Sequence, residues 1–287
     1  MSFIIFVLST LNADSIVDII NNDPTSTWVA VEYHPSIMSR EKMKRRLGAY
    51  LPPRPSHKLV PRNDLPENFD SREQWPGLIL GVRDQGDCGS CWAFAITSCA
   101  GDRLGVQGRG VGDLSPQDLV SCDTDDYGCG GSSLDPAWQW MFTDGVTTEQ
   151  CIPYVSGSGR VPVCPAKCKD GSKIQRYRPS KWLYLQDSQM QDEIIQRGPI
   201  QVAFTVYDDF RTYKSGVYIH KTGAQGGGHA VLCLGWGVED GTPYWLCQNS
   251  WGAEWGDQGY FKILRGDNHC GIESYAYTGH FTYPRSV

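Results

Sequence analysis

Hydrophobic residues in the first half of the chain recur at helical spacing. Between Cys91 and Leu104 they fall every three or four positions, which is the period of an α-helix that buries one face. Gly105 is expected to end this helix. Residues 114–122 and 134–143 are shorter helix candidates, and Ser115 followed by Pro116 is a suitable N-cap and N1 pair for the first of them. The pattern therefore predicts a long helix followed by two shorter ones.

From about residue 200 the hydrophobic period changes to two, which is typical of half-buried strands. The alternation predicts strands over residues 201–207, 229–237 and 242–251, and GVEDGTP (237–243) is expected to join the last two as a hairpin loop. The first half is therefore predicted to be helical and the second mainly β. A ligand cleft is expected between two such halves.

A short apolar run, Phe3 to Leu11 (FIIFVLSTL), opens the chain and is followed by the small residue Ala13. The run is too short to cross a bilayer but has the length of a signal-peptide core, although no Lys or Arg precedes it. We interpret residues 1–13 as a signal peptide, and the alternative is a buried strand. No later segment is apolar enough to span a membrane.

Residues 14–64 lack the pattern of a folded core. SREKMKRRLGAY (39–50) predicts a short helix with Ser39 as its N-cap and Glu41 in its first turn. The proline-rich stretch LPPRPSHKLVPRND (51–64) is expected to be extended and exposed, which suits proteolytic cleavage. Because sequence of steadier composition begins at Leu65, we place a domain boundary at about 63–66.

Charge is distributed unevenly along the chain. The net charge of −6 over 287 residues gives no reason to expect binding to nucleic acid. Residues 1–64 carry eight Lys/Arg and six Asp/Glu, whereas residues 65–287 carry 18 and 26. A basic front end and an acidic body favour electrostatic docking of one on the other. The alternative is that the basic residues belong to a solvated charged helix.

The 11 cysteines are scattered rather than grouped in repeated zinc-ligand pairs. Such a count indicates an oxidising compartment. Zinc binding by Cys88 and Cys91, or by Cys164 and Cys168, is the alternative, but it requires reduced thiols. We therefore expect no metal ion and no cofactor.

The strongest chemical signal is QGDCGSCWAF, residues 85–94. Cys91 would stand at the start of the predicted helix, where unpaired amides and the macrodipole favour a thiolate. The pattern CGSCW matches a nucleophile signature in which the first cysteine is disulfide-bonded and the second is free. Cys91 is therefore the candidate nucleophile, and a buried structural cysteine is the alternative.

At this point the chain resembles the papain-like cysteine proteases, and within them the cathepsin B-like branch. Besides RDQGDCGSCWAF, the segments LPENFDSREQWP, GGHAVLCLGWGVEDGTPYWLCQNSW and DQGYFKILRGDNHCGIES are similar to that branch. The resemblance implies an α+β, papain-like two-lobed fold with the active-site cleft between the lobes. It also implies a peptidase domain over residues 65–287, with a helical lobe mainly over 85–160 and a β-barrel-like lobe mainly over 175–287. Residues 14–64 would then be an inhibitory propeptide.

The resemblance also implies which residues complete the site. A cysteine nucleophile needs a base within reach of the thiol and a third group that fixes the base's tautomer. His229 would be that base and Asn249 the orienting group, and the predicted hairpin can place them on neighbouring strands. Trp251 would shield their hydrogen bond from water. Gln85 and the backbone N–H of Cys91 would form the oxyanion hole.

The cathepsin B-like pattern further implies three disulfides, Cys88–Cys129, Cys122–Cys164 and Cys151–Cys168. One family disulfide is missing at both ends, because Leu78 or Ile79 and Gly105 stand near the positions of its cysteines. The remaining four cysteines are expected to be free buried thiols, since cross-strand geometry rarely suits a disulfide; they are Cys99, Cys233, Cys247 and Cys270.

Two departures from cathepsin B bear on specificity. The family's histidine-bearing insertion, which closes one end of the cleft, is missing: Cys151 and Cys164 are separated only by IPYVSGSGRVPV. An open cleft and endopeptidase activity are therefore expected, with a carboxydipeptidase as the alternative enzyme. The acid at the base of the main specificity pocket falls at Tyr275, whose phenol cannot neutralise a guanidinium. A preference for apolar residues two positions before the scissile bond follows.

The substrate-binding set is also implied by the resemblance. Gly131 and Ser132 match the paired glycines that bind substrate backbone, and Leu134, Ala230 and Tyr275 would wall the specificity pocket. The full set is Gly131, Ser132, Leu134, Gly228, Ala230, Trp251 and Tyr275.

The sequence thus predicts a cysteine endopeptidase, made as a zymogen, that hydrolyses peptide bonds through a thioester on Cys91. Its expected partners are protein and peptide substrates, its own propeptide and cystatin-type inhibitors. We expect a monomer that binds neither nucleic acid nor membrane, in the secretory pathway, a lysosome-like or vacuolar compartment, or outside the cell. The alternative class is a catalytically inactive peptide-binding module on the same fold, against which the four filled catalytic positions argue.

Overall fold

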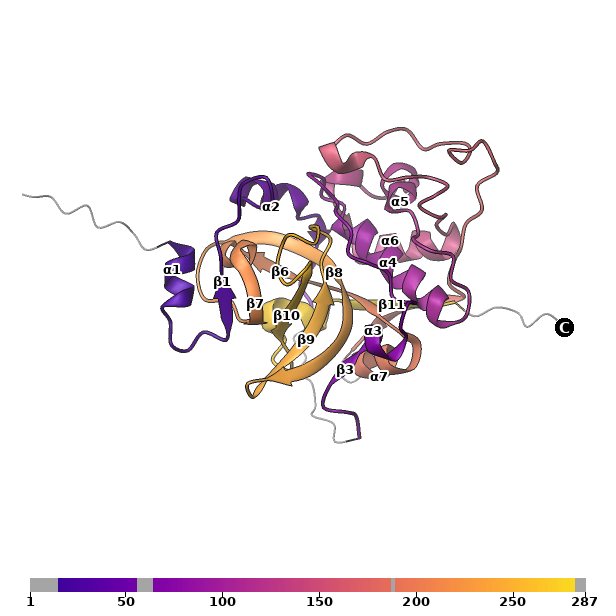
Figure 1. Ribbon diagram of the computed structural model, residues 1–287. Helices are drawn as coiled ribbons and strands as arrows, with labels where there is room; N and C mark the ends of the chain where they lie inside the picture. The colour runs from indigo at the N-terminus through magenta and orange to yellow at the C-terminus, as the bar shows by residue number, and fades with distance from the viewer. Residues whose placement is uncertain (1–14, 56–63, 187–188, 282–287) are drawn as a thin grey trace, which may run out of the picture.

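The computed structural model describes residues 15–55, 64–186 and 189–281. The predicted signal peptide lies outside these ranges. The molecule has helices α4–α6 gathered on one side and strands β6–β10 on the other (Figure 1). This is the α+β, two-lobed arrangement that was predicted.

The helical lobe contains the three predicted helices. They are α4 (Cys91–Val106), α5 (Pro116–Cys122) and α6 (Leu134–Thr143). The prediction that Gly105 ends the first helix is wrong, because α4 runs through it to Val106. A Cβ at Gly105 would lie only 2.9 Å from the carbonyl oxygen of Leu78. The two positions at which the family disulfide is missing therefore lie against each other, and a residue without a side chain fits this approach.

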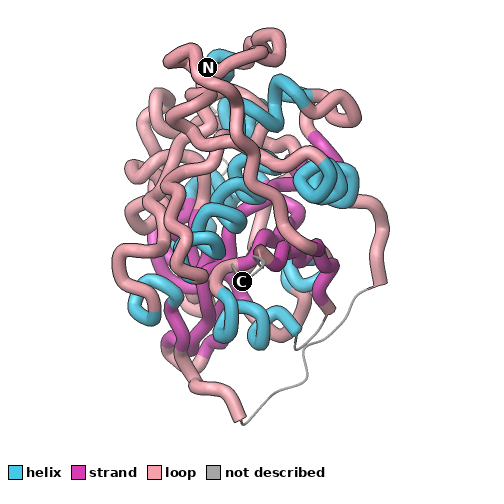
Figure 2. Tube along the Cα trace, turned by 90° about the vertical axis from the view of Figure 1, so that its right-hand side faces the viewer, coloured by secondary structure: helices cyan, strands magenta, loops and turns pink. Residues whose placement is uncertain are grey.

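Seen from the side of the helical lobe, much of the chain runs in loops (Figure 2). Three disulfides tie these loops together, and they are the three predicted pairs: Cys88–Cys129, Cys122–Cys164 and Cys151–Cys168. The other cysteines are free; Cys91, Cys99, Cys233 and Cys247 are buried, and Cys270 is partly exposed. The first disulfide joins the loop before α4 to the 3₁₀ turn η1 (Gly128–Gly130), which brings the start of α4 close to the chain that follows η1.

The β lobe is built on a mixed sheet with the strand order β1-β7-β10-β9-β8-β6-β11-β5. The strands are β1 (Trp28–Ala30), β5 (Lys181–Leu185), β6 (Ile200–Tyr207), β7 (Tyr213–Tyr218), β8 (Gln225–Glu239), β9 (Thr242–Gln248), β10 (Tyr260–Leu264) and β11 (Ala276–His280). Helix α7 (Gln189–Arg197) precedes β6. Strand β3 (Phe69–Asp70) pairs with β8 and leads into α3 (Ser71–Gln74).

Strands β8 and β9 form the predicted hairpin. Both residues at its turn have positive φ, 48° at Asp240 and 77° at Gly241. Such angles match a tight turn to the right-handed twist of the flanking strands. Cys233 and Cys247 face each other across this hairpin, both as free thiols.

The N-terminal segment, which we define as residues 15–55, packs on the β lobe. It comprises α1 (Ile16–Asn21), β1, α2 (Arg40–Arg46) and β2 (Ala49–Tyr50). Ser39 caps α2 as predicted, since its hydroxyl accepts from the backbone N–H of Lys42. The prediction that this region has no core character is wrong: Ile20, Trp28, Met38 and Met43 are buried in the same apolar cluster as the inside of the β lobe.

The end of the N-terminal segment lies between the lobes. Strand β2 runs parallel to β4 (Ser132–Ser133) of the helical lobe and antiparallel to the start of β8. The segment therefore joins both lobes at the position where a cleft was expected. From here on, residues 64–281 are called the body.

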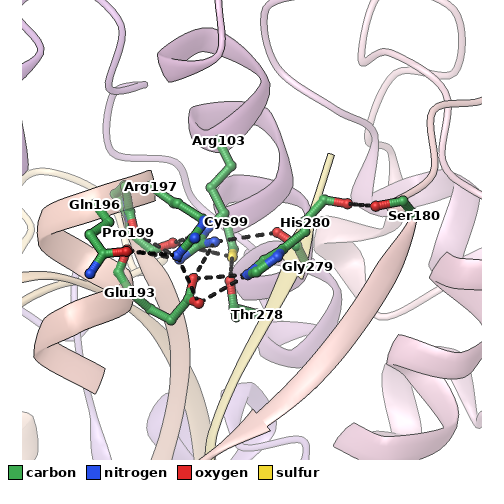
Figure 3. A network of polar contacts seen from close by, with 11 residues as sticks. Cys99, Arg103, Ser180, Glu193, Gln196, Arg197, Pro199, Thr278, Gly279 and His280 are labelled. Atoms are coloured by element: carbon green, nitrogen blue, oxygen red, sulfur yellow. Dashed lines mark hydrogen bonds and ion pairs between the residues drawn. The ribbon is translucent and has the colours of Figure 1, made fainter. Parts of the chain in front are cut away.

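A buried polar network ties α4, α7 and β11 together (Figure 3). The guanidinium of Arg103, whose side chain is fully buried, lies 3.1 Å from the carboxylate of Glu193 and donates to the Pro199 carbonyl at 2.7 Å. Glu193 also bonds the ring of His280 at 2.9 Å. Buried charges are tolerated only when paired and hydrogen-bonded, as they are here.

Candidate active site

Cys91 is the first residue of α4 and is fully buried. Its Sγ accepts a hydrogen bond from the backbone N–H of Ala230 at 3.5 Å, so the thiol lies against the strand that carries His229. Burial raises the pKa of the Cys91 thiol to about 11, and hydrogen bonds from backbone N–H groups, including that of Ala230, act in the opposite direction. In this state Cys91 is a thiol rather than a thiolate.

His229 and Asn249 meet as predicted. Nε2 of His229 lies 2.7 Å from Oδ1 of Asn249, and the backbone N–H of Ser250 donates to the same oxygen at 2.8 Å. Because this oxygen is the acceptor of both bonds, a neutral imidazole carries its proton on Nε2. Nδ1 is then the basic nitrogen; it is buried and has no hydrogen-bond partner in the described part of the chain.

The surroundings of His229 hold it in the neutral form. Burial lowers the pKa of His229 to about 4, the hydrogen bond to Asn249 raises it, and the positive charge of Arg46 lowers it further. The ring of Trp251 lies 4.7 Å from the imidazole ring, centroid to centroid. Trp251 therefore covers the histidine, as expected from the sequence.

The side-chain amide of Gln85 is fixed at both ends. Its Oε1 accepts from the hydroxyl of Ser250 at 2.8 Å, so its Nε2 is the donor end. Nε2 donates to the carbonyl of Cys88 at 2.7 Å and to the carbonyl of Arg46 at 2.8 Å. A backbone carbonyl of the N-terminal segment thus occupies the donor that was predicted to stabilise an oxyanion.

Two glycines let the N-terminal segment pass close to the body. A Cβ at Gly131, where φ is 111°, would lie 2.7 Å from the carbonyl oxygen of Gly48. A Cβ at Gly228 would lie 2.1 Å from the carbonyl oxygen of Ala49. Side chains at either position would therefore exclude a strand from the cleft.

Ser132 binds the segment through its backbone. Its N–H donates to the carbonyl of Gly48 at 2.9 Å, while its hydroxyl donates to the Ser133 carbonyl at 2.6 Å and to the carboxylate of Asp126. The side chain is therefore engaged inside the helical lobe. The backbone N–H expected to bind substrate is therefore available to a strand in the cleft, and here it binds the N-terminal segment.

The predicted pocket residues lie in the same apolar cluster as Ala49 of the N-terminal segment. Leu134, Ala230 and Tyr275 are all buried members of this cluster, and Tyr275 also lines a cavity together with Ala49 and Pro52. The hydroxyl of Tyr275 donates to the carbonyl of Pro52 at 2.5 Å. Glu273, which could have supplied an acid here, is instead buried and bonded to the indole N–H of Trp245.

Four arginines of the N-terminal segment pair with four aspartates of the body. The pairs are Arg40–Asp208 at 2.8 Å, Arg45–Asp87 at 3.1 Å, Arg46–Asp84 at 3.2 Å and Arg54–Asp135 at 2.6 Å. This is the electrostatic docking that the uneven charge predicted. The guanidinium of Arg46 also donates to the Trp251 carbonyl at 3.3 Å.

Comparison with known proteins now identifies the family. Residues 65–280 match the family model described as "Papain family cysteine protease". The chain belongs to the papain family of cysteine proteases. Within this family it is cathepsin B-like: it is 44% identical to "Cathepsin B-like CP2" of Giardia intestinalis, over 79% of this chain and 78% of that protein. It is 39% identical to "Cathepsin B-like cysteine proteinase 5" of Caenorhabditis elegans, over 94% and 90%.

Solved structures of papain-family zymogens have the same fold. The chain is similar to proCathepsin B S9 from Trypanosoma congolense, with a TM-score of 0.82 and 35% identity over 93% of this chain and 97% of that one. It is also similar to digestive procathepsin L2 from Tenebrio molitor, with a TM-score of 0.75 and 29% identity over 92% and 87%.

Three residues of this papain-family site were missed from the sequence. Ser250, which orients Gln85, directly follows Asn249 in QNSW, but nothing in that motif indicates a partner 165 residues away. Arg46 and Asp135 were missed because their roles depend on contact between the N-terminal segment and the body. The only signal was the uneven charge, which does not identify individual pairs.

The described residues contain no group of three or more His, Cys, Asp or Glu placed to hold a metal ion, and Cys88, Cys164 and Cys168 are in disulfides. No described helix combines the length and apolarity needed to cross a bilayer.

Proposed function

We propose that this papain-family protease hydrolyses internal peptide bonds through Cys91. The observation that carries the proposal is the bond between His229 Nε2 and Asn249, which leaves the buried Nδ1 as the basic nitrogen, while the Cys91 sulfur bonds the N–H of the next residue, Ala230. Nδ1 takes the thiol proton, the sulfur attacks the peptide carbonyl, and the developing negative charge is stabilised by Gln85 Nε2 and the Cys91 N–H. His229 then protonates the leaving amine, and water hydrolyses the thioester.

We further propose that residues 14–64 are the inhibitory propeptide and residues 65–287 the peptidase domain. The N-terminal segment occupies the cleft, and its Arg46 carbonyl binds the donor of Gln85. Burial under this segment moves the pKa values of Cys91 and His229 away from those of a thiolate–imidazolium pair. Removal of the segment admits water and removes the charge of Arg46, so the ion pair becomes favourable.

The apolar pocket around Ala49 supports a preference for apolar side chains two positions before the scissile bond. Burying a Leu or Val side chain there gains roughly 1.5–3 kcal/mol. The short stretch between Cys151 and Cys164 supports an open primed side and cleavage within chains. The partners are then protein and peptide substrates and inhibitors of the cystatin type. Three disulfides fit a route through the secretory pathway to a lysosome-like compartment or the outside of the cell.

Hydrolysis of paired peptides by the full-length chain, after acid activation, tests this function. One peptide of each pair has a free C-terminal carboxylate and the other a C-terminal amide. Equal cleavage of both is expected, because the stretch between Cys151 and Cys164 lacks the histidines that would bind the carboxylate, and Cys91→Ala is expected to abolish cleavage. A large preference for the free acid, with dipeptides released stepwise, would instead establish a carboxydipeptidase. Near-normal turnover by Cys91→Ala would exclude Cys91 as the nucleophile.

A further inference from the structure

Arg54 of the N-terminal segment lies in a pocket made of three tyrosine rings and one carboxylate. Its guanidinium carbon is 4.2 Å from the ring centroid of Tyr184, 5.4 Å from that of Tyr277 and 5.7 Å from that of Tyr275. Its Nη2 lies 2.6 Å from the Asp135 carboxylate and also donates to the Tyr277 hydroxyl. Only 16% of the Arg54 side chain is exposed, although the proline-rich stretch was expected to be exposed throughout.

The pocket is built by the body rather than by the N-terminal segment. Tyr184 and Tyr277 are directly paired across strands β5 and β11, with ring centroids 5.4 Å apart. The hydroxyl of Tyr184 donates to the Ser274 carbonyl at 3.0 Å, which fixes its ring next to Tyr275. Asp135 stands in the first turn of α6, in the other lobe. The pairing of the two strands and the bond of Tyr184 do not involve Arg54, so the body itself holds these rings in place.

The pocket adjoins the site where a substrate binds. Tyr275 contributes to both: it lines a cavity together with Ala49, and its ring faces Arg54 from the neighbouring pocket. The chain passes from one to the other within a few residues, and Pro52 between them bonds the Tyr275 hydroxyl. A peptide that follows the same path in the cleft would therefore bring a side chain to the tyrosines.

We propose that this pocket is a subsite of the enzyme for the guanidinium side chain of a substrate arginine, and that Arg54 occupies it in the zymogen. The proposal rests on the proteolytic function proposed above and deepens it. Aromatic faces and a carboxylate together favour a cation, and the flat, weakly hydrated guanidinium suits stacked rings better than an ammonium group does. The substrate signature is then an apolar residue in the first pocket and arginine in the second.

A peptide panel tests the subsite with the enzyme obtained by activating the full-length chain. Leucine is kept two positions before the scissile bond, and arginine, lysine, citrulline or leucine is placed in turn three and four positions before it. Citrulline keeps the shape of arginine without its charge. At one of these two positions we expect kcat/KM at least fivefold higher for arginine than for citrulline, with lysine between them. A ratio near one at both positions would overturn the proposal and leave the pocket as an anchor of the segment only.

Variants of two acids on the same helix supply the matched comparison. Asp135→Asn is expected to bring the arginine-to-citrulline ratio below two. Asp144→Asn, at the exposed end of α6 outside the pocket, is expected to retain the wild-type ratio. An unchanged ratio in Asp135→Asn would refute the assignment of the carboxylate and with it the subsite.

Binding of a synthetic peptide separates this proposal from the proteolytic one. A peptide of residues 44–55 and its analogue with citrulline at position 54 are titrated against the enzyme freed of its N-terminal segment. Binding at least fivefold weaker for the analogue supports cation recognition by the body, whether or not the enzyme cleaves peptides. Equal binding of the two peptides refutes it, even if hydrolysis through Cys91 is established.

Discussion

At the scale of single residues, Arg46 carries a buried positive charge that acts on His229, the proposed base. Only 1% of its side chain is exposed, and it contacts Asp84 and the Trp251 carbonyl. Its charge helps to lower the pKa of His229, and its own carbonyl accepts from the side-chain amide of Gln85. One residue of the segment therefore acts on both the proposed base and the proposed oxyanion donor.

Arg46→Gln is expected to expose the latent reactivity of Cys91 in the full-length chain. Loss of the charge raises the pKa of His229, and loss of two anchors loosens the segment over the thiol. We expect labelling of Cys91 by a thiol-directed epoxide at neutral pH to become at least tenfold faster. Arg45→Gln is the control, because the Arg45 side chain is 52% exposed and its pair with Asp87 is at the surface. Equal labelling rates for the two variants would contradict this role of Arg46.

The placement of the site residues was predictable to the extent that a motif carried it. Cys91, His229, Asn249 and Gln85 stand in motifs of the family, and the structure brings them together. Ser250 and Asp135 could not be predicted in this way, because each acts through a contact between distant parts of the chain. A serine after a strand, or an aspartate in the first turn of a helix, has many ordinary functions. Which of them applies here is visible only in the folded structure.

At the scale of helices and strands, an apolar period repeated several times was the signal that predicted an element reliably. The long helix α4 and the hairpin β8–β9 were predicted, since each repeats its apolar period several times. Strands β1 and β2 were missed, because two or three residues show no period. Their pairing also depends on partners far away, as when the Thr27 hydroxyl donates to a carbonyl 190 residues along the chain.

The network around Glu193 makes α7 a structural link between α4 and β11. Glu193→Gln removes the carboxylate that faces Arg103, whose side chain is fully buried. We expect a loss of about 3–5 kcal/mol in the free energy of unfolding, because an uncompensated buried charge remains. Denaturant unfolding at neutral pH measures it.

Arg197→Gln is the matched control for this network. Arg197 pairs with the same Glu193 but is 40% exposed, so its loss is expected to cost less than about 1 kcal/mol. A similar cost for both variants would show that the buried pair with Arg103 does not stabilise the junction of the lobes.

At the scale of the whole molecule, ion pairs between segment and body hold the segment over the cleft. One of them depends on pH in a defined direction. Hydrogen bonds from the Lys221 ammonium and from Thr25 lower the pKa of Asp23 to about 2, so this stabilisation is complete above the ordinary carboxyl pKa of 3.8 and is lost as the pH falls towards 2. The Arg40→Gln, Arg45→Gln double variant lacks two of the four arginine–aspartate pairs, so less acid is needed to release its segment. It is therefore expected to become active towards a small peptide at a higher pH than the wild type.

Activity after brief incubations over a pH series measures the onset. The same series at high salt is the control, because salt screens exposed pairs and should shift the wild-type onset in the same direction. An onset pH identical in the wild type and the double variant would mean that apolar packing alone holds the segment in place.

The N-terminal segment belongs to the same polypeptide chain as the body that it covers. Cleavage of the chain between the two therefore changes how strongly the segment inhibits. While the chain is intact, the segment meets the cleft at an effective concentration fixed by the tether, independent of the amount of protein. A cut after Pro55 turns the same contacts into a bimolecular complex, which dissociates on dilution. Inhibition then depends on the concentration of the cut protein. In a small compartment, where that concentration is high, the segment stays bound, and after release into a large volume it dissociates.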